Sequence, residues 1–120
     1  MNEKPPLRLR KRAEFLAVRS GIKQRGPLFL LEMRKRQEGE ISKTNELSDM
    51  APRIGFTVSK KNGNAVKRNR IRRRLREAVS EIAKDHLKRR TDYVIVARPD
   101  CLTVSYDRLK NELKHRFDKV

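Results

Sequence analysis

The residues best suited to chemistry lie in one basic segment, 60–76. Nine of its seventeen residues are Lys or Arg, and none is Asp or Glu. Like charges four residues apart on a helix repel each other, so stability alone does not explain such a segment. An arginine side chain presents a planar fork of N–H donors that can hold a phosphate with two hydrogen bonds. The segment therefore predicts a surface that binds a polyanion.

Residue types that support metal binding are scattered along the chain. His86 and His115 are far apart in the sequence and have no cysteine near them, which disfavours a metal site. Cys101 is the single cysteine and is interpreted as a buried thiol. Asp92 and Asp100 flank a predicted strand and are interpreted as capping or loop residues. The sequence therefore predicts no metal-binding side chains.

Residue types that support catalysis are equally sparse. Glu77 and Glu81 are four residues apart on a predicted helix rich in arginine. Carboxylates and guanidinium groups at helical spacing form ion pairs, so we interpret both as partners of Arg73 and Arg74 rather than as a catalytic pair. No serine lies in a nucleophile elbow, and no glycine-rich phosphate loop occurs in the sequence. The sequence predicts no catalytic residue and favours binding over bond cleavage.

Composition narrows the class of partner. The 120 residues have the length of one domain, 1–120, and carry a net charge of +17 with 39% charged residues. Nucleic acid is the first partner that this charge predicts, and an anionic membrane surface is the competing one. No apolar run approaches the length of a membrane span, and the first residues lack the apolar core of a signal peptide. The expected location is therefore the cytoplasm.

A long helix, predicted over 65–86, positions the basic segment. Asn64 is a suitable N-cap for it. At 100° per residue, one narrow stripe of this helix is apolar and consists of Ile71, Leu75, Ala78, Val79 and Ile82. The opposite side is polar and basic and carries Asn69, Arg70, Arg73, Arg74 and Arg76. Acidic residues gather in the second half, so the positive face belongs to the first half.

The remaining patterns predict two more helices and several strands. Helices are expected over 12–20 and 106–118, and strands over 28–33, 53–59 and 92–97. Residues 25–27 are expected to form a turn, 1–8 a flexible arm, and 37–52 an acidic insertion loop. If that loop joins two strands, the order is α-β-β-β-α-β-α. General rules predict a right-handed crossover around the long helix.

Within the basic segment, the pattern Lys60-Lys61-x-Gly63-Asn64-Ala65-Val66-x-Arg68-Asn69-Arg70-x-Arg72-Arg73 resembles the signature of the bacterial ribonuclease P protein component. Arg-Asn-Arg is the centre of that signature. The flanking segments 53–59 and 92–98 also resemble the family, as does the N-terminal spacing of Leu9, Phe15 and Gly21. The resemblance covers nearly the whole chain.

The resemblance implies an α+β fold, an α/β sandwich like ribosomal protein S5 domain 2, with a left-handed crossover. It also implies a protein subunit without catalytic residues of its own. Such a subunit binds the catalytic RNA of ribonuclease P and the 5′ leader of precursor tRNA, while the RNA and the Mg²⁺ that it mainly holds perform the hydrolysis. The implied RNA-facing residues are Lys60, Lys61, Asn64, Lys67, Arg68, Asn69, Arg70, Arg72, Arg73 and Arg76. The implied leader cleft contains Phe15, Phe56, Arg10, Arg12 and Arg19.

Two positions depart from the family pattern. Arg19 stands where a second cleft aromatic is common, and Leu31-Glu32 stand where another is common, so leader contacts are expected to rely more on charge than on stacking. Two other functions fit the residues alone. One is a ribosomal or other structural RNA-binding protein with the same fold. The other is a non-specific binder of DNA or of a membrane surface.

Overall fold

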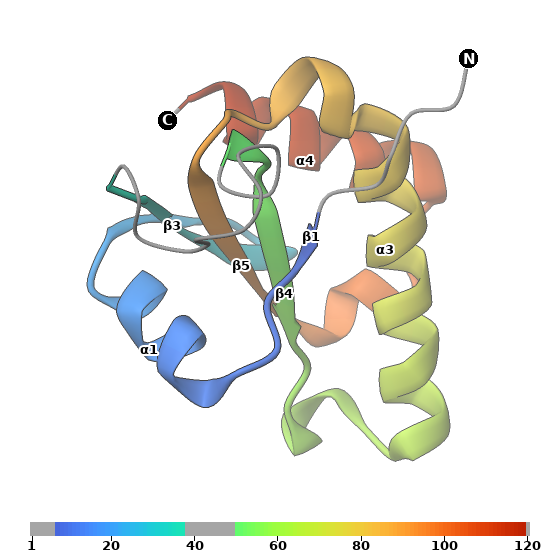
Figure 1. Cartoon of the computed structure of the whole chain (residues 1–120). Coiled ribbons are helices and arrows are strands. Elements are labelled where there is room, and N and C mark those ends of the chain that lie inside the picture. The colour runs from blue at the N-terminus through green and yellow to red at the C-terminus, as the bar shows by residue number, and fades with distance from the viewer. Residues whose placement is uncertain (1–6, 38–49, 120) are drawn as a thin grey trace.

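The computed structural model describes residues 7–37 and 50–119 as a mixed sheet with helices on both faces (Figure 1). In chain order the elements are β1 (Leu7–Arg8), α1 (Arg12–Arg19), β2 (Ile22–Arg25), β3 (Phe29–Lys35), β4 (Arg53–Thr57), the 3₁₀ turn η1 (Lys60–Asn62), α3 (Ala65–His86), β5 (Thr91–Ala97), the 3₁₀ turn η2 (Pro99–Leu102) and α4 (Tyr106–Asp118). From α1 onward the predicted α-β-β-β-α-β-α order is confirmed, and the strands that the sequence did not locate are β1 and β2.

The five strands lie in the order β1-β4-β5-β3-β2. β5 is central and pairs in parallel with β4 and antiparallel with β3. β4, α3 and β5 form the crossover, and its hand is left, as the family resemblance implies. Crossovers are right-handed in about 98% of cases. General sequence rules therefore gave the wrong hand, and the resemblance gave the right one.

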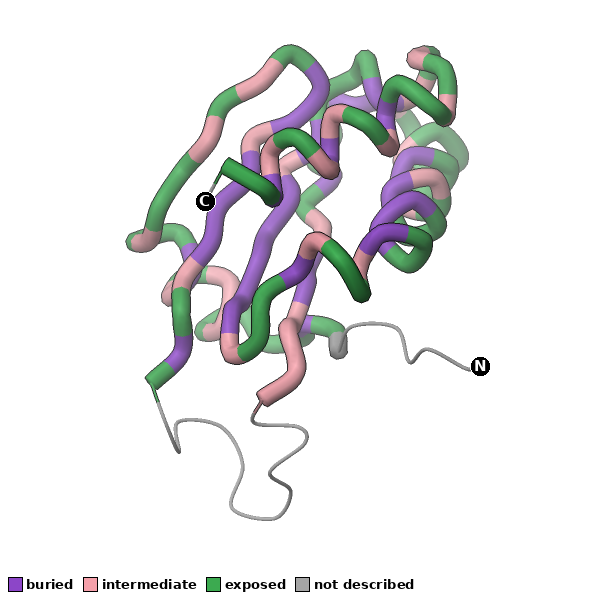
Figure 2. Tube along the Cα trace, turned by 90° about the horizontal axis from the view of Figure 1, so that it is seen from above, coloured by how far each residue is buried: buried purple, intermediate pink, exposed green. Residues whose placement is uncertain are grey.

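The core lies mainly on the sheet face that α3 and α4 cover. The predicted apolar stripe of α3 is buried there, confirming the pattern. Tyr93 of β5 meets Phe117 of α4 edge to face, with ring centroids 5.1 Å apart. A smaller cluster on the other face joins α1 to the sheet through Leu9, Val18 and Val94. Figure 2 shows the buried residues following the central strands and the inner side of the helices.

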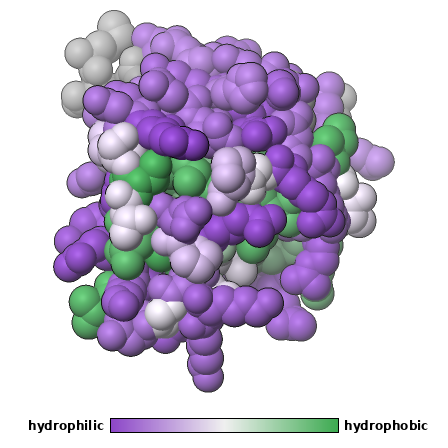
Figure 3. All heavy atoms as spheres, turned by 180° about the vertical axis from the view of Figure 1, so that it is seen from behind, coloured by the Kyte–Doolittle hydropathy of each residue, from purple (hydrophilic) through white to green (hydrophobic). Residues whose placement is uncertain are grey.

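Hydrophilic residues cover most of the surface. In Figure 3, the face seen from behind is largely hydrophilic, and hydrophobic residues are visible as smaller areas among the hydrophilic ones. Large apolar side chains that are exposed include Leu16, Ile22 and Val66. No helix within residues 7–37 and 50–119 is long and apolar enough to cross a membrane.

Two predicted irregular segments are partly ordered. Of the arm predicted over 1–8, residues 1–6 lie outside the described residues, but Leu7 and Arg8 form β1 and pair with β4. Of the loop predicted over 37–52, residues 38–49 lie outside the described residues. Its far end is held in place, because Met50 accepts a backbone hydrogen bond of 2.9 Å from Arg90.

Candidate nucleic-acid interface

The 3₁₀ turn η1 and the capped N-terminus of α3 hold the basic segment 60–76 in position. The side chain of Asn62 in η1 is buried, and its Nδ2 donates to the carbonyl oxygen of Ala97 at 3.4 Å. Asn64 Oδ1 accepts a hydrogen bond of 3.0 Å from the backbone N–H of Lys67. The prediction of Asn64 as N-cap is therefore confirmed. Sequence reasoning missed Asn62, because its burial depends on the end of β5.

The predicted RNA-facing residues lie at the surface. Arg68 and Arg72 are half-buried, and the others are exposed: Lys60, Lys61, Asn64, Lys67, Asn69, Arg70, Arg73 and Arg76. Arg72 Nη1 donates to Asn69 Oδ1 at 3.1 Å, which orients that guanidinium group. Among the residues that the structure describes, no carboxylate forms an ion pair with an arginine of this set. The surface is therefore available to an external anion.

The start of α3 adds to this positive potential. No acidic residue lies in its first turn, where the helix dipole places a partial positive charge. Partial burial lowers the pKa of Arg76, and the neighbouring charges of Arg8 and Arg72 lower it further. The side chain stays charged at neutral pH, and the smaller part of the lowering of its pKa comes from repulsion between cations. A bound anion would relieve that repulsion.

Arg74 differs from the other arginines of α3, because it has a structural role. Its Nη1 donates to the carbonyl oxygen of Leu102 at 2.6 Å, and its Nη2 donates to that of Val104. These bonds fasten the connection between η2 and α4 to the side of α3. The predicted pairing of Arg74 with Glu77 or Glu81 is therefore wrong.

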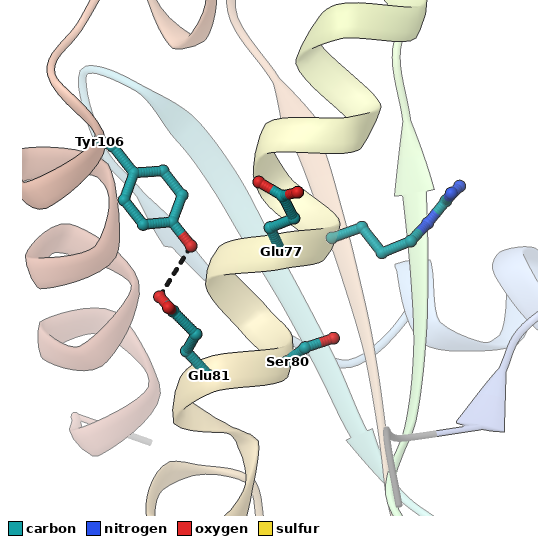
Figure 4. Close-up of a pocket in the computed structure, with 5 residues that line it drawn as sticks. Glu77, Ser80, Glu81 and Tyr106 are labelled. Carbon is teal, nitrogen blue, oxygen red and sulfur yellow. Dashed lines mark hydrogen bonds between the residues drawn. The ribbon is translucent and has the colours of Figure 1, made fainter.

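The two glutamates face a shallow pocket between α3 and α4 (Figure 4). Glu81 Oε2 accepts from the hydroxyl of Tyr106 at 2.7 Å, and Lys110 Nζ lies 3.5 Å from the same oxygen. Glu81 thus pairs with α4, and the predicted pairing with Arg73 is also wrong. Burial and the hydrogen bond to Glu81 raise the pKa of Tyr106, so the phenol stays protonated at neutral pH.

Phe15 is the aromatic residue that α1 holds against the opposite face of the sheet. Its ring lies over Gly55 of β4, where an added Cβ would come within 2.6 Å of two ring atoms. The ring packs on the cluster of Leu9, Val18 and Val94. Glycine at position 55 therefore allows the ring to approach the backbone.

Phe56 lies on the other face of the sheet. It packs against the core beneath α3 and α4. Neighbouring strand residues point to opposite faces, so a ring over Gly55 places Phe56 away from α1. The prediction that Phe15 and Phe56 line one cleft is therefore wrong.

The basic members of the predicted leader cleft lie at the ends of α1. Arg10 precedes the helix, Arg12 begins it, Arg19 ends it, and all three are exposed. Their contact with a leader stays a prediction. The arrangement places cations at both ends of the helix that carries Phe15.

The register of the sheet adds a row of residues on the Phe15 face that sequence reasoning missed. Thr57 pairs with Val96, Val96 with Leu30, and Leu30 with Arg25. Thr57 is two residues from Gly55 and so shares its face. Leu30 and Val96 are half-buried, whereas Thr57 and Arg25 are exposed. Only strand alternation within 53–59 could have indicated part of this row.

A network of ion pairs fixes α1 to the sheet beneath this face. Asp92 of β5 is 1% exposed. Arg36 Nη1 lies 2.5 Å from its Oδ1, and Arg53 Nη2 lies 2.7 Å from its Oδ2. Arg53 Nη1 also lies 2.5 Å from Glu14 Oε2 of α1. The interpretation of Asp92 as a capping or loop residue is therefore wrong.

Glu14 also secures the start of α1. Its Oε1 accepts backbone hydrogen bonds from Lys11 at 2.8 Å and from Arg10 at 2.9 Å. Burial alone would raise the pKa of Glu14, but these amides and then Arg53 lower it overall. The hydrogen bond to Asp92 raises the pKa of Arg53. The charged forms of Glu14 and Arg53 are thus both stabilised in the folded protein.

Possible metal ligands are few. The described part of the chain contains no group of three or more His, Cys, Asp or Glu that could hold a metal ion. His86 Nδ1 lies 2.7 Å from Asp118 Oδ1. Cys101 is fully buried, and burial raises its pKa to about 11. The interpretation of Cys101 as a buried thiol is therefore confirmed.

The comparisons with known proteins agree with this geometry. The family model described as Ribonuclease P matches residues 4–120. The ribonuclease P protein component of Bartonella quintana is 54% identical over 117 residues, which are 98% of this chain and 85% of that protein. That of Brucella suis is 56% identical over 118 residues, which are 97% of this chain and 81% of that protein.

Solved structures give the same fold. The RNase P protein of Staphylococcus aureus matches with a TM-score of 0.68 and 29% identity over 90% of this chain and 89% of that one. The RNase P protein of Thermotoga maritima matches with a TM-score of 0.74 over 94% of this chain and 96% of that one. The two sequences are 24% identical, so this match supports only the fold.

The α+β fold with an arginine-rich helix face therefore belongs to an RNA-binding protein, and the chain belongs to the ribonuclease P protein family. It is the protein subunit of an endoribonuclease that matures the 5′ ends of tRNA.

Proposed function

We propose that the basic face of η1 and α3 binds the catalytic RNA of ribonuclease P, and that the Phe15 face of the sheet binds the 5′ leader of precursor tRNA. The observation that carries this proposal is the set of α3 arginines that have no carboxylate partner in the described structure. Guanidinium groups bind phosphate strongly because charge and fork geometry match. Hydrolysis belongs to the RNA.

Mg²⁺ enters this proposal only as an ion held by RNA. The basic face offers donors and positive charge, which are unsuited to a hard cation that prefers oxygen ligands. The protein residues would hold phosphates of the two RNAs in fixed positions. We assign this activity to the cytoplasm, where precursor tRNA would be processed.

Reconstitution tests the proposal for the catalytic RNA. The chain is added to the cognate ribonuclease P RNA at low Mg²⁺, and cleavage of precursor tRNA is measured. The protein is expected to stimulate cleavage. Absence of stimulation would rule out the proposed function.

A triple variant, Arg68→Ala with Arg70→Ala and Arg73→Ala, tests the face itself. If each arginine neutralises one phosphate, the slope of log affinity against log salt should fall by about 2–3. The matched control removes three exposed cations elsewhere, at Arg89, Arg108 and Lys119. Equal effects of the two triple variants would show that net charge, and not this face, binds the RNA.

Phe15→Ala tests the leader face separately. Stacking of one base on an aromatic ring contributes about 1–3 kcal/mol, so affinity for precursor tRNA should fall roughly 5- to 150-fold. Affinity for mature tRNA should stay unchanged. The control is Leu16→Ala, which removes an exposed apolar side chain next to it. An equal loss for mature tRNA would refute the leader assignment.

A further inference from the structure

A row of arginines follows one flank of α3. Arg68, Arg72 and Arg76 are spaced by four residues, so they rise by about 6 Å per step and turn only slightly around the helix axis. Arg68 and Arg72 are half-buried and Arg76 is exposed. The row borders the apolar stripe that packs on the sheet. It therefore belongs to the edge of α3 that meets the sheet, and not to its outermost side.

The strand next to this flank contributes a fourth cation. β1 is the edge strand that pairs with β4, with Arg8 opposite Ile54. Figure 1 shows β1 as the strand of the sheet on the side of α3. Leu9 is buried on the α1 face, and side chains alternate along a strand. Arg8 therefore lies on the same face as Ile54, which is part of the core beneath α3.

The side chain of Arg8 thus projects from the face of the sheet that α3 covers, where it adds to the positive charge of the arginine row. The positive charges of Arg8 and Arg72 both act on Arg76 and lower its pKa, after the larger effect of burial. Neither Arg8 nor Arg76 pairs with a carboxylate in the described structure, and Arg72 donates to the amide oxygen of Asn69. The buried Nε of Arg68 also has no hydrogen-bond partner among these residues.

Backbone contacts on both sides of Arg8 hold this arrangement. Leu7 pairs with Arg53, and the backbone N–H of Leu9 donates to the carbonyl oxygen of Ile54 at 2.9 Å. The backbone of Arg8 is thus fixed against β4, on the face of the sheet that α3 covers, although its side chain is exposed. Cations held close together in this way repel each other and gain stability when an anion joins them.

We propose that Arg8, Arg72 and Arg76 form a phosphate-binding site for the RNA backbone, so that the edge strand β1 is part of the RNA interface. The proposal rests on the proposed function and extends it from α3 to a second element. Arginines from two elements can grip one phosphate, or two consecutive ones, from different directions. An RNA strand bound here would follow the edge of the sheet beside α3.

The first test measures affinity of the full chain for the cognate ribonuclease P RNA as a function of salt. Arg8→Ala is expected to weaken binding about tenfold and to reduce the salt slope by about 0.9. Arg8→Lys keeps the charge but loses the fork, so it should recover the slope and only part of the affinity. The control is Arg89→Ala, an exposed arginine beyond the C-terminal end of α3.

Equal losses for Arg8→Ala and Arg89→Ala would overturn this proposal, because the effect would then reflect net charge. Unchanged binding by Arg8→Ala would also overturn it. If the Arg68, Arg70 and Arg73 triple variant still weakened binding, the proposed function would stand while this site failed. If neither variant weakened binding, both proposals would fail.

A tethered probe tests the position directly. Cys101 is fully buried, and its pKa is raised to about 11, so it reacts slowly near neutral pH. A variant with Arg8→Cys therefore takes an iron–EDTA reagent selectively at position 8. Localised cleavage of the catalytic RNA is expected, and Arg89→Cys serves as the comparison. The proposed site would be refuted if the probe at position 8 did not cleave the RNA, or cleaved it no more strongly than the probe at position 89.

Discussion

The buried Asp92 allows a stability prediction of unusual size for one isosteric change. Asp92→Asn removes one negative charge from between Arg36, whose side chain is 0% exposed, and Arg53, whose side chain is 12% exposed. Both guanidinium groups would then stay in a poorly solvated site without that carboxylate. Removing one partner of a buried ion pair costs about 3–5 kcal/mol. For a chain of this size the midpoint of thermal unfolding should fall by roughly 10–20 °C.

Urea unfolding followed by far-UV circular dichroism measures this change at fixed salt. The control is Asp85→Asn, because Asp85 is exposed and its replacement raises the net charge by the same amount. A loss below about 1 kcal/mol, or one equal to that of the control, would refute the reasoning. It would show that Asp92 contributes through its shape and hydrogen bonds and not through its charge.

Three further predictions concern the elements around the two faces. Because the pKa of Glu14 is lowered in the folded protein from 4.5, its contribution is present above that value and is lost as pH falls through the lowered pKa. Glu14→Gln should therefore be less stable than the parent chain at pH 7, with a difference in urea midpoint that disappears in acid; a constant difference would contradict this. Gly55→Ala should displace the Phe15 ring, since the new Cβ would lie 2.6 Å from it. A cost of about 1–3 kcal/mol and weaker leader binding are expected, and unchanged affinity for precursor tRNA would count against the leader face. Asn64→Ala removes the N-cap of α3 and should cost about 1 kcal/mol in urea unfolding, whereas Asn111→Ala, at an exposed position on α4, should cost less; equal costs would argue against the cap.

Local patterns in the sequence determined most of the elements. The apolar stripe of α3 and its cap at Asn64 act within a few residues, so local patterns located α3 and α4 at their observed bounds. β2 and β1 escaped prediction because both are short edge strands, whose formation depends on the strand beside them. Their sequences contain no run of alternating residues long enough to show a period.

The sequence by itself determined that this chain carries an excess of guanidinium groups on one helix, because charge and helical period are properties of the chain alone. The tertiary structure decided which of these groups remain available. It assigned Arg74 to the carbonyl groups of Leu102 and Val104, and it placed Arg8 on the face of the sheet that α3 covers. It also placed Phe15 and Phe56 on opposite faces of the sheet. These outcomes depend on strand pairing and on packing between distant segments, which residue spacing does not encode.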